Sequence, residues 1–287
     1  MTYDRVGRSG LDYIPCRYGA SRTLFRGPRA DLNGPHVLFL GGTTTYGKFI
    51  PRPFPSQIEA RTHLSCVNLG AVNAGPDLFL NDPIVMEMAQ RASATVVQIT
   101  GAPNLTNRYY SVHPRRNDRF LQASALLRTI YRDVDFTAFH FTRHLLQHLM
   151  DLSPDRFRIL LVELKEAWVA RMIRLIEEVG SPVVLLWMAD HALADAPGAD
   201  GQLWGRGDPL FVDRGMVDQL RDRVTDVVEV VARDSERAAG TEGMVFSQME
   251  YAAAQSQLGV GLHHTAAEAL APVLCEIVPK DTPVFLN

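Results

Sequence analysis

Short apolar runs alternate with amphipathic segments along most of this chain. Five runs of apolar residues that stop near Gly, Asn or Asp predict strands at 36–40, 65–69, 95–100, 182–188 and 224–231. Between these runs, apolar residues recur at three- and four-residue spacing, which is typical of helices with one buried face. This spacing predicts helices at 55–62, 81–91, 118–131, 135–150, 157–179, 214–223 and 264–275.

The clearest helix signal lies at 157–179. Ser153 and Pro154 precede it as an N-cap and a first-turn proline, and Gly180 follows it as a stop. Strands separated by helices indicate right-handed crossovers and a parallel sheet. The sequence therefore predicts an α/β fold, three-layer α/β/α with a mainly parallel five-stranded sheet.

We expect one main domain with two irregular features. Residues 1–35 are rich in Gly, Arg and Pro, which predicts an irregular leader packed on a single domain formed by residues 36–287. The helices at about 105–155 would form an insertion between strands three and four. The carboxyl ends of the parallel strands are the expected place for a site.

Composition narrows the class of protein. The chain has 287 residues, 46% of them apolar, and a net charge of −3, which gives no general attraction to nucleic acid. Its cysteines, Cys16, Cys66 and Cys275, form neither a disulfide framework nor a zinc motif. No leading apolar segment or long uncharged apolar run is present, so we expect a cytoplasmic protein without a membrane span. We expect a small-molecule substrate, no cofactor and no metal, and a homo-oligomer is compatible with the sequence.

Arginine gathers in two places, and two interpretations stay open. The clusters are solvated loops, or they form an anion-binding rim around a site. The residues are Arg5, Arg8, Arg17, Arg22, Arg26 and Arg29 near the start, and Arg108, Arg115, Arg116 and Arg119 further on.

Four short blocks follow strands or precede the last helix, and together they resemble the SGNH (GDSL-type) hydrolase and acyltransferase superfamily. The blocks run from Gly41 to Gly47, from Asn68 to Gly75, from Thr100 to Asn107, and from Gly261 to Leu270. The resemblance covers roughly residues 36–275 and implies an SGNH/flavodoxin-like fold. The chain also resembles an uncharacterised bacterial family.

The resemblance implies an esterase or O-acyltransferase acting on a small ester or acylated substrate, and the arginine clusters are compatible with an anionic one. Thr43 stands where the family has its nucleophilic Ser, and His263 matches the catalytic His. Gly75, or alternatively Gly70, and Asn104 match the oxyanion-hole donors. The family's Asp in the first block is Gly42 here, and the Asp that orients the His is absent. The other residues that we expect to bind substrate are Gly42, Thr45, Lys48, Asn73 and Arg108.

Two other functions compete with this hypothesis. The stretch from Gly42 to Lys48 fits G-x-x-x-x-G-K after a strand, and Asp190 ends a later apolar strand, so a phosphate- or sulfate-donor transferase is one alternative. Phe49 stands where a phosphate loop needs Ser or Thr. The other alternative is a non-catalytic protein of this fold that binds a carbohydrate or lipid-like ligand in the same cleft.

Three histidines at four-residue spacing, His140, His144 and His148, lie on one face of a predicted helix. Two imidazoles at this spacing could hold a metal ion. No acidic or cysteine ligand stands nearby, so the pattern favours an ordinary packed helix.

Overall fold

The computed structural model describes residues 10–194 and 207–278. Its centre is one sheet of five strands in the order β2-β1-β3-β6-β7, and every neighbouring pair is parallel. The strands are β1 (His36–Leu40), β2 (Ser65–Asn68), β3 (Ala94–Gln98), β6 (Val183–Ala189) and β7 (Asp226–Val231). The predicted α/β class and the five-stranded parallel sheet are confirmed.

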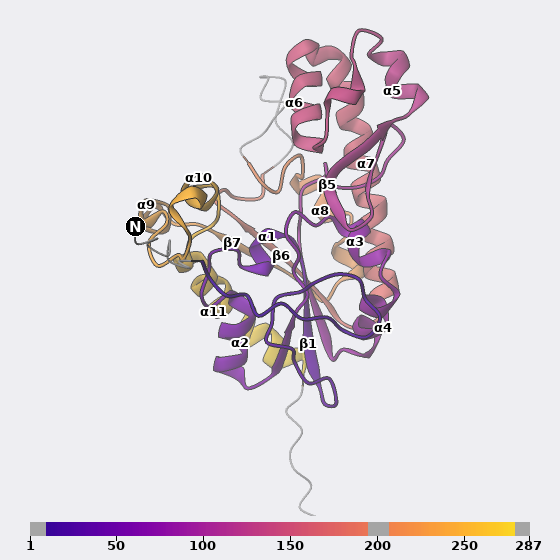
Figure 1. The fold of residues 1–287 in the computed structure, drawn as a ribbon. Coiled ribbons are helices and arrows are strands. Elements are labelled where there is room, and N and C mark those ends of the chain that lie inside the picture. The colour runs from indigo at the N-terminus through magenta and orange to yellow at the C-terminus, as the bar shows by residue number, and fades with distance from the viewer. Residues whose placement is uncertain (1–9, 195–206, 279–287) are drawn as a thin grey trace, which may run out of the picture.

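Helices cover both faces of this sheet (Figure 1). Helices α2 (Phe54–Thr62) and α11 (Val260–Ile277) lie on one face. Helices α3 (Pro76–Leu80), α4 (Pro83–Arg91) and the long α7 (Pro154–Val179) lie on the other. Successive side chains of a strand point to opposite faces, so a sheet covered on both sides needs apolar residues at consecutive positions.

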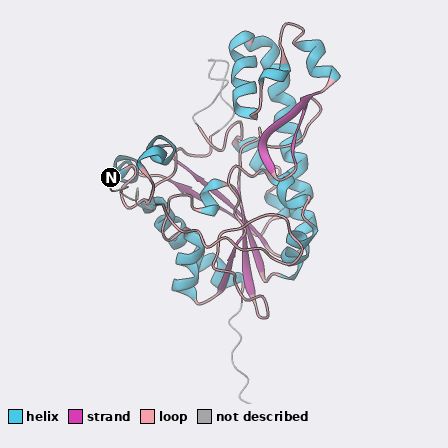
Figure 2. Cartoon of the chain, in the orientation of Figure 1, coloured by secondary structure: helices cyan, strands magenta, loops and turns pink. Residues whose placement is uncertain are grey.

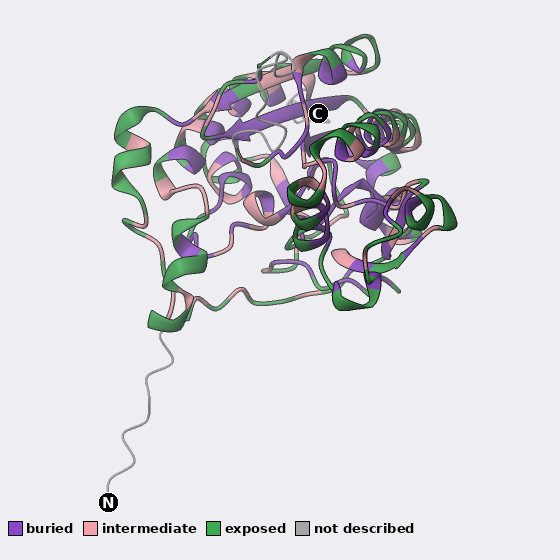
Figure 3. Ribbon diagram, turned by 90° about the horizontal axis from the view of Figure 1, so that it is seen from above, coloured by how far each residue is buried: buried purple, intermediate pink, exposed green. Residues whose placement is uncertain are grey.

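Strand β1 shows this requirement clearly. All five of its residues are buried. Val37 and Phe39 pack in the cluster under α2 and α11, whereas Leu38 and Leu40 pack in the cluster under α4 and α7. Figure 3 shows the sheet as a buried layer between more exposed helices. The unbroken apolar run in the sequence therefore reflects burial on two faces.

The segment between β3 and β6 differs from its prediction. The helix expected over 118–131 is wrong in its first half, because β4 (Tyr110–His113) and β5 (Arg116–Ala123) form an antiparallel hairpin. Only α5 (Ala125–Ile130), capped by the Ser124 hydroxyl, is helical there. Figure 2 shows this hairpin apart from the main sheet, below the helices at that end of the molecule. Pairing with β4 is a non-local contact that local spacing does not reveal.

The rest of this segment is a short 3-10 helix (Phe136–Ala138) and α6 (Thr142–Leu152), in place of one helix over 135–150. The other elements are short: α1 (Thr43–Tyr46), α8 (Arg214–Asp218), a 3-10 helix (Arg221–Arg223), α9 (Asp234–Ala239), a 3-10 helix (Gln248–Glu250) and α10 (Tyr251–Gln255). None of the helices in the described ranges has the length and apolar character that crossing a membrane requires.

Arg26, from the arginine-rich N-terminal stretch, is buried and has a structural role. Its guanidinium donates to the carbonyl oxygens of Gly47 (2.5 Å), Ile50 (2.8 Å) and Pro51 (3.0 Å), which follow α1. Burial lowers the pKa of Arg26. Arg17, Arg22 and Arg29 of the same stretch are exposed, and Arg5 and Arg8 lie outside the described residues.

Candidate functional site

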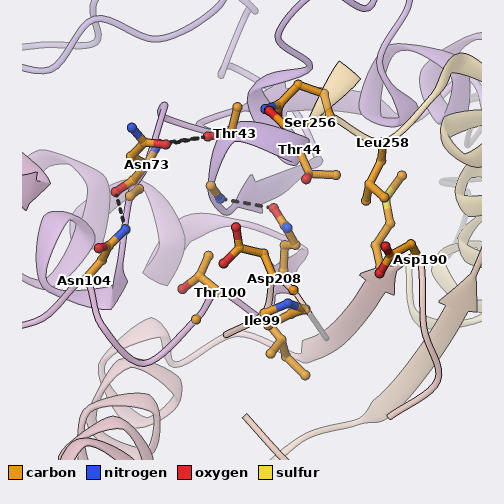
Figure 4. Close-up of a pocket in the computed structure, with 18 of the residues that line it drawn as sticks. Thr43, Thr44, Asn73, Ile99, Thr100, Asn104, Asp190, Asp208, Ser256 and Leu258 are labelled. Carbon is orange, nitrogen blue, oxygen red and sulfur yellow. Dashed lines mark hydrogen bonds between the residues drawn. The ribbon is translucent and has the colours of Figure 1, made fainter. Parts of the chain in front are cut away.

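The loops after β1, β2, β3 and β6 meet at the carboxyl ends of the strands and enclose a cleft of about 400 Å³. Strand order reverses between β1 and β3, and open α/β sheets bind ligands at this kind of switch point. The cleft's described lining is mainly polar: Gly42, Thr43, Thr44, Asn73, Ala74, Gln98, Ile99, Thr100, Gly101, Asn104, Arg143, Met188, Asp190, Gly207, Asp208, Pro209, Ser256, Gln257 and Leu258. Figure 4 shows these groups converging from several strand ends.

Gln98, at the end of β3, organises the turn that carries Thr43. Its Oε1 accepts from the Gly42 amide (3.1 Å), the Thr45 amide (3.2 Å) and the Thr45 hydroxyl (2.7 Å). A Cβ at Gly41 would lie 2.1 Å from Thr45 Oγ1, so only glycine fits before this turn. Thr45 is fully buried, and its hydroxyl stabilises the turn through its bond to Gln98. Thr43 and Thr44 face the cleft.

The Thr43 hydroxyl is paired with Asn73. The Asn73 amide donates to Thr43 Oγ1 (2.9 Å), and Thr43 Oγ1 donates to Asn73 Oδ1 (3.2 Å). Asn73 has a φ of 56°, in the left-handed region that Asn tolerates better than most residues. This backbone conformation aims the Asn73 N–H at the hydroxyl.

Asn104 lies beside this pair, as Figure 4 shows. Its Nδ2 donates to the Asn73 carbonyl (3.1 Å), and its Oδ1 accepts from the Thr142 hydroxyl (2.9 Å) at the start of α6. Asp118 of β5 accepts from Asn73 Nδ2 (3.0 Å). The structure therefore brings together three residues that the sequence singled out, Thr43, Asn73 and Asn104, and adds supports from the hairpin and α6.

Gly75 does not act as the expected oxyanion donor, because its amide is already bound. The Gly75 N–H donates to the buried Asn117 Oδ1 (2.9 Å), and a Cβ there would lie 1.9 Å from the Asn104 carbonyl oxygen. Gly70, the alternative, donates to Asn68 Oδ1 (2.9 Å). The amide that points at the Thr43 hydroxyl belongs to Asn73 instead. Gly75 is a close-packing position that lets the second and third loops touch.

The expected pairing of Thr43 with His263 is not formed. Helix α11 begins at Val260, earlier than predicted, so His263 is a helical residue and its side chain is 1% exposed. The His263 ring stacks on Phe54, and its Nδ1 accepts from the Phe54 amide (3.3 Å). Burial, with a smaller contribution from the Arg26 charge, lowers the pKa of His263 to about 3. All nine histidines of the chain fall within the described ranges, and none of them lines the cleft.

Two further basic residues expected at the site lie elsewhere. The Lys48 ammonium lies over the Phe49 ring (4.8 Å to the centroid), and Lys48 does not line the cleft. Arg108 binds Glu163, with Nε at 2.5 Å from Oε2, in a separate hollow along α7. The 42–48 stretch also forms the single helical turn α1, in which the amides of Tyr46 and Gly47 bond within the turn. It is therefore not an open phosphate loop.

The predicted row of three histidines on one helix is wrong in part, because α6 begins at Thr142 and carries only His144 and His148, whereas His140 precedes it. The rings of His144 and His148 lie 5.0 and 5.1 Å from the Phe139 ring. Within the described ranges, no group of three metal-ligating side chains comes together.

Sequence reasoning missed Arg143 and Asp208, which line the cleft and form an ion pair (3.3 Å). Arg143 is on α6, whose place over the cleft depends on tertiary packing. Asp190, which also lines the cleft, could be identified from the sequence because it directly follows a predicted strand. Its Oδ1 is 2.6 Å from His191 Nδ1.

The sequence matches one known protein family over nearly its whole length. Residues 1–278 match the model of the family described as Domain of unknown function (DUF6473). The chain belongs to this family. None of the curated proteins matches the sequence of this DUF6473 member.

Three solved structures share a limited similarity with this DUF6473 chain. A carbohydrate esterase family 2 enzyme with a carbohydrate-binding domain from Corynascus thermopiles (Myceliophthora fergusii) has 11% identity and a TM-score of 0.42, over 89% of this chain and 70% of that one. An extracellular lipase from Streptomyces rimosus has 9% identity and a TM-score of 0.41, over 85% and 100%. The lipase Lip_vut3 from a goat rumen metagenome has 14% identity and a TM-score of 0.37, over 82% and 98%.

The chemistry of the DUF6473 cleft follows from its own residues. It offers hydroxyls, carboxamides and two carboxylates, and the cation among its described lining residues, Arg143, is paired with Asp208. Such a set donates and accepts hydrogen bonds well. It does not provide the hydroxyl–imidazole pair that nucleophilic catalysis of the SGNH type requires.

Proposed function

We propose that the cleft beside Thr43 binds a neutral, hydroxyl-rich small molecule of the carbohydrate type. In this proposal Thr43 recognises the ligand and does not attack it. The observation that carries it is the partner of the Thr43 hydroxyl, which is Asn73, while no histidine lines the cleft. A carboxamide oxygen is a hydrogen-bond acceptor and not one of the usual general bases.

The polar lining supports a sugar-like ligand. Each sugar hydroxyl both donates and accepts, and so do the hydroxyls and carboxamides of Thr43, Thr44, Thr100 and Asn104. Among the charged groups of the described lining, Arg143 pairs with Asp208, and Asp190 lies 2.6 Å from His191 Nδ1. An anionic donor such as a nucleotide or sulfate ester would meet two carboxylates there, and Lys48 lies elsewhere. The phosphate- or sulfate-donor alternative is therefore disfavoured.

Acyl transfer at Thr43 is the second candidate, and one observation favours it. Two hydrogen-bond donors, the Asn73 amide and the Asn104 carboxamide, lie beside the Thr43 hydroxyl. To stabilise an oxyanion they would have to leave their present acceptors, Thr43 Oγ1 and the Asn73 carbonyl oxygen. In this candidate the proton acceptor would be a carboxylate of the cleft, Asp190 or Asp208, in place of an imidazole.

Calorimetric titration with methyl glycosides of glucose, galactose, mannose and N-acetylglucosamine tests the proposal. We expect one of them to bind, and Asn104→Ala to weaken that binding at least about tenfold, a loss of about 1.4 kcal/mol. The matched control is Asn33→Ala, because Asn33 is exposed and does not line the cleft. Failure of all four sugars to bind, together with ester hydrolysis that Thr43→Ala abolishes, would replace the proposal with the second candidate.

A further inference from the structure

A second compartment adjoins the cleft under the start of α6. Its volume is about 570 Å³, within the range of about 300–1,000 Å³ that small-molecule sites span. The two compartments share five lining residues: Asn73, Gly101, Asn104, Arg143 and Asp208. A single ligand that contacts Asn104 from the cleft can therefore extend into the second compartment.

The lining of the second compartment differs chemically from that of the cleft. Pro103, Phe141 and Leu210 come from three separate segments and give it a larger share of apolar surface than the cleft has, and Asp118, His144 and Gln147 line its polar side. The Phe141 side chain is 42% exposed although it is large and aromatic. The Arg119 guanidinium carbon lies 4.4 Å from the centre of the Phe141 ring and helps to hold it.

The boundary between the two compartments is electrically balanced. The ion pair between Arg143 and Asp208 (3.3 Å) lines both of them. A paired boundary presents no isolated charge to an apolar group that passes it, and so does not carry the desolvation cost of an unpaired charge. The polar end of the ligand would meet the hydroxyls and carboxamides of the cleft, and the apolar end would meet Pro103, Phe141 and Leu210.

We infer that the ligand of the cleft carries an apolar substituent, an alkyl, acyl or aryl group, which lies in the second compartment against Phe141. The ligand class is then an amphiphilic glycoside or an acylated sugar, and a free sugar fills only half of the site. This inference rests on the proposed function, because it assigns the hydroxyl-rich half of the ligand to the Thr43 cleft.

The test compares methyl, n-octyl and phenyl forms of the same four glycosides by calorimetry, with the octyl forms kept below their micelle concentrations. We expect an octyl or phenyl form to bind at least about thirtyfold more tightly than its methyl form. The better of the two identifies the substituent as alkyl or aryl. Phe141→Ala should remove most of this advantage, so that the ratio of the methyl to the octyl or phenyl dissociation constant falls toward one. The matched control is Leu152→Ala, at the far end of α6, where the side chain is equally exposed (42%).

The possible failures are distinguishable. If methyl, octyl and phenyl forms bind equally well, the inference is overturned and the proposed function stands. If none binds, both are overturned. If the advantage survives in Phe141→Ala, the apolar group lies elsewhere and the inference is overturned. Intermolecular NOEs between octyl protons and the Phe141 ring in the wild-type protein give a second readout that does not depend on the variant folding.

Discussion

Thr43 and Asn73 exchange hydrogen bonds: the Asn73 amide donates to Thr43 Oγ1 at 2.9 Å, and Thr43 Oγ1 donates to Asn73 Oδ1 at 3.2 Å. Asp118 holds the other end of the same carboxamide through Asn73 Nδ2. The hydroxyl is thereby oriented by a neutral group. This relationship decides how the cleft can work, because a nucleophilic hydroxyl needs a base at the place that Asn73 Oδ1 occupies.

Thr43 should be inert toward reagents for activated hydroxyls. We expect a fluorophosphonate probe to leave the wild-type protein unlabelled, as judged by intact mass spectrometry, because no imidazole accepts the hydroxyl proton. Thr43→Ser, which keeps the hydroxyl, should also stay unlabelled. One probe per chain on the wild type, absent in Thr43→Ala, would show instead that Thr43 is a nucleophile.

Gly75→Ala should destabilise the protein by about 2–3 kcal/mol, since the new Cβ would lie 1.9 Å from the Asn104 carbonyl oxygen and overpacking of this kind strains the backbone. Urea unfolding measures the change in the free energy of unfolding. Gly34→Ala is the matched control, because a Cβ at Gly34 meets nothing within 4 Å. Equal effects of the two substitutions would mean that the second and third loops do not touch at Gly75.

Gln98→Leu should lower the free energy of unfolding by at least about 2 kcal/mol. The substitution keeps much of the side-chain volume but leaves the Gly42 amide, the Thr45 amide and the Thr45 hydroxyl without their shared acceptor. The exposed Gln219→Leu should stay within about 0.5 kcal/mol of the wild type. Denaturation curves of the two variants make the comparison, and a neutral Gln98→Leu would contradict the assigned role.

His263 should make stability depend on pH on the acidic side of neutrality. Its pKa is lowered to about 3 in the folded protein and is about 6.5 in an unfolded chain, so between these values the unfolded state binds the extra proton. The contribution is therefore complete above about pH 6.5. It falls by up to about 1.4 kcal/mol per pH unit as the pH drops toward 3.

His263→Asn removes the titrating ring and keeps an acceptor for the Phe54 amide. The free energy of unfolding of this variant, measured between pH 4 and 7, should lose that part of the wild-type slope. The control His264→Asn changes the exposed neighbouring histidine and should keep the slope. Identical slopes in all three proteins would show that His263 is not held neutral by burial.

The strands and the longest helices could be predicted because their signals are local. The run at 36–40 is apolar throughout since β1 is buried on both faces, and Ser153, Pro154 and Gly180 mark both ends of α7. The spacing of apolar residues in β5 predicts a helix. The segment is extended because it pairs with β4, a contact between strands that this spacing does not encode. The loops after β1, β2 and β3 could be recognised because each follows directly on a predicted strand. They supply Thr43, Asn73 and Asn104 to one cleft.

By itself, the sequence determined the five strands of the main sheet, the long helix α7 and the loops that end the strands, because burial and backbone hydrogen bonding impose a period on these segments. Only the tertiary structure decided which side chains meet at those loops. Because α11 starts earlier than predicted, His263 is a helical residue packed against Phe54. The packing of α6 brings Arg143 to the cleft. The Asn117 side chain accepts the hydrogen bond of the Gly75 amide. Such meetings depend on helix rotation and loop packing between residues far apart in the chain, which no local period encodes.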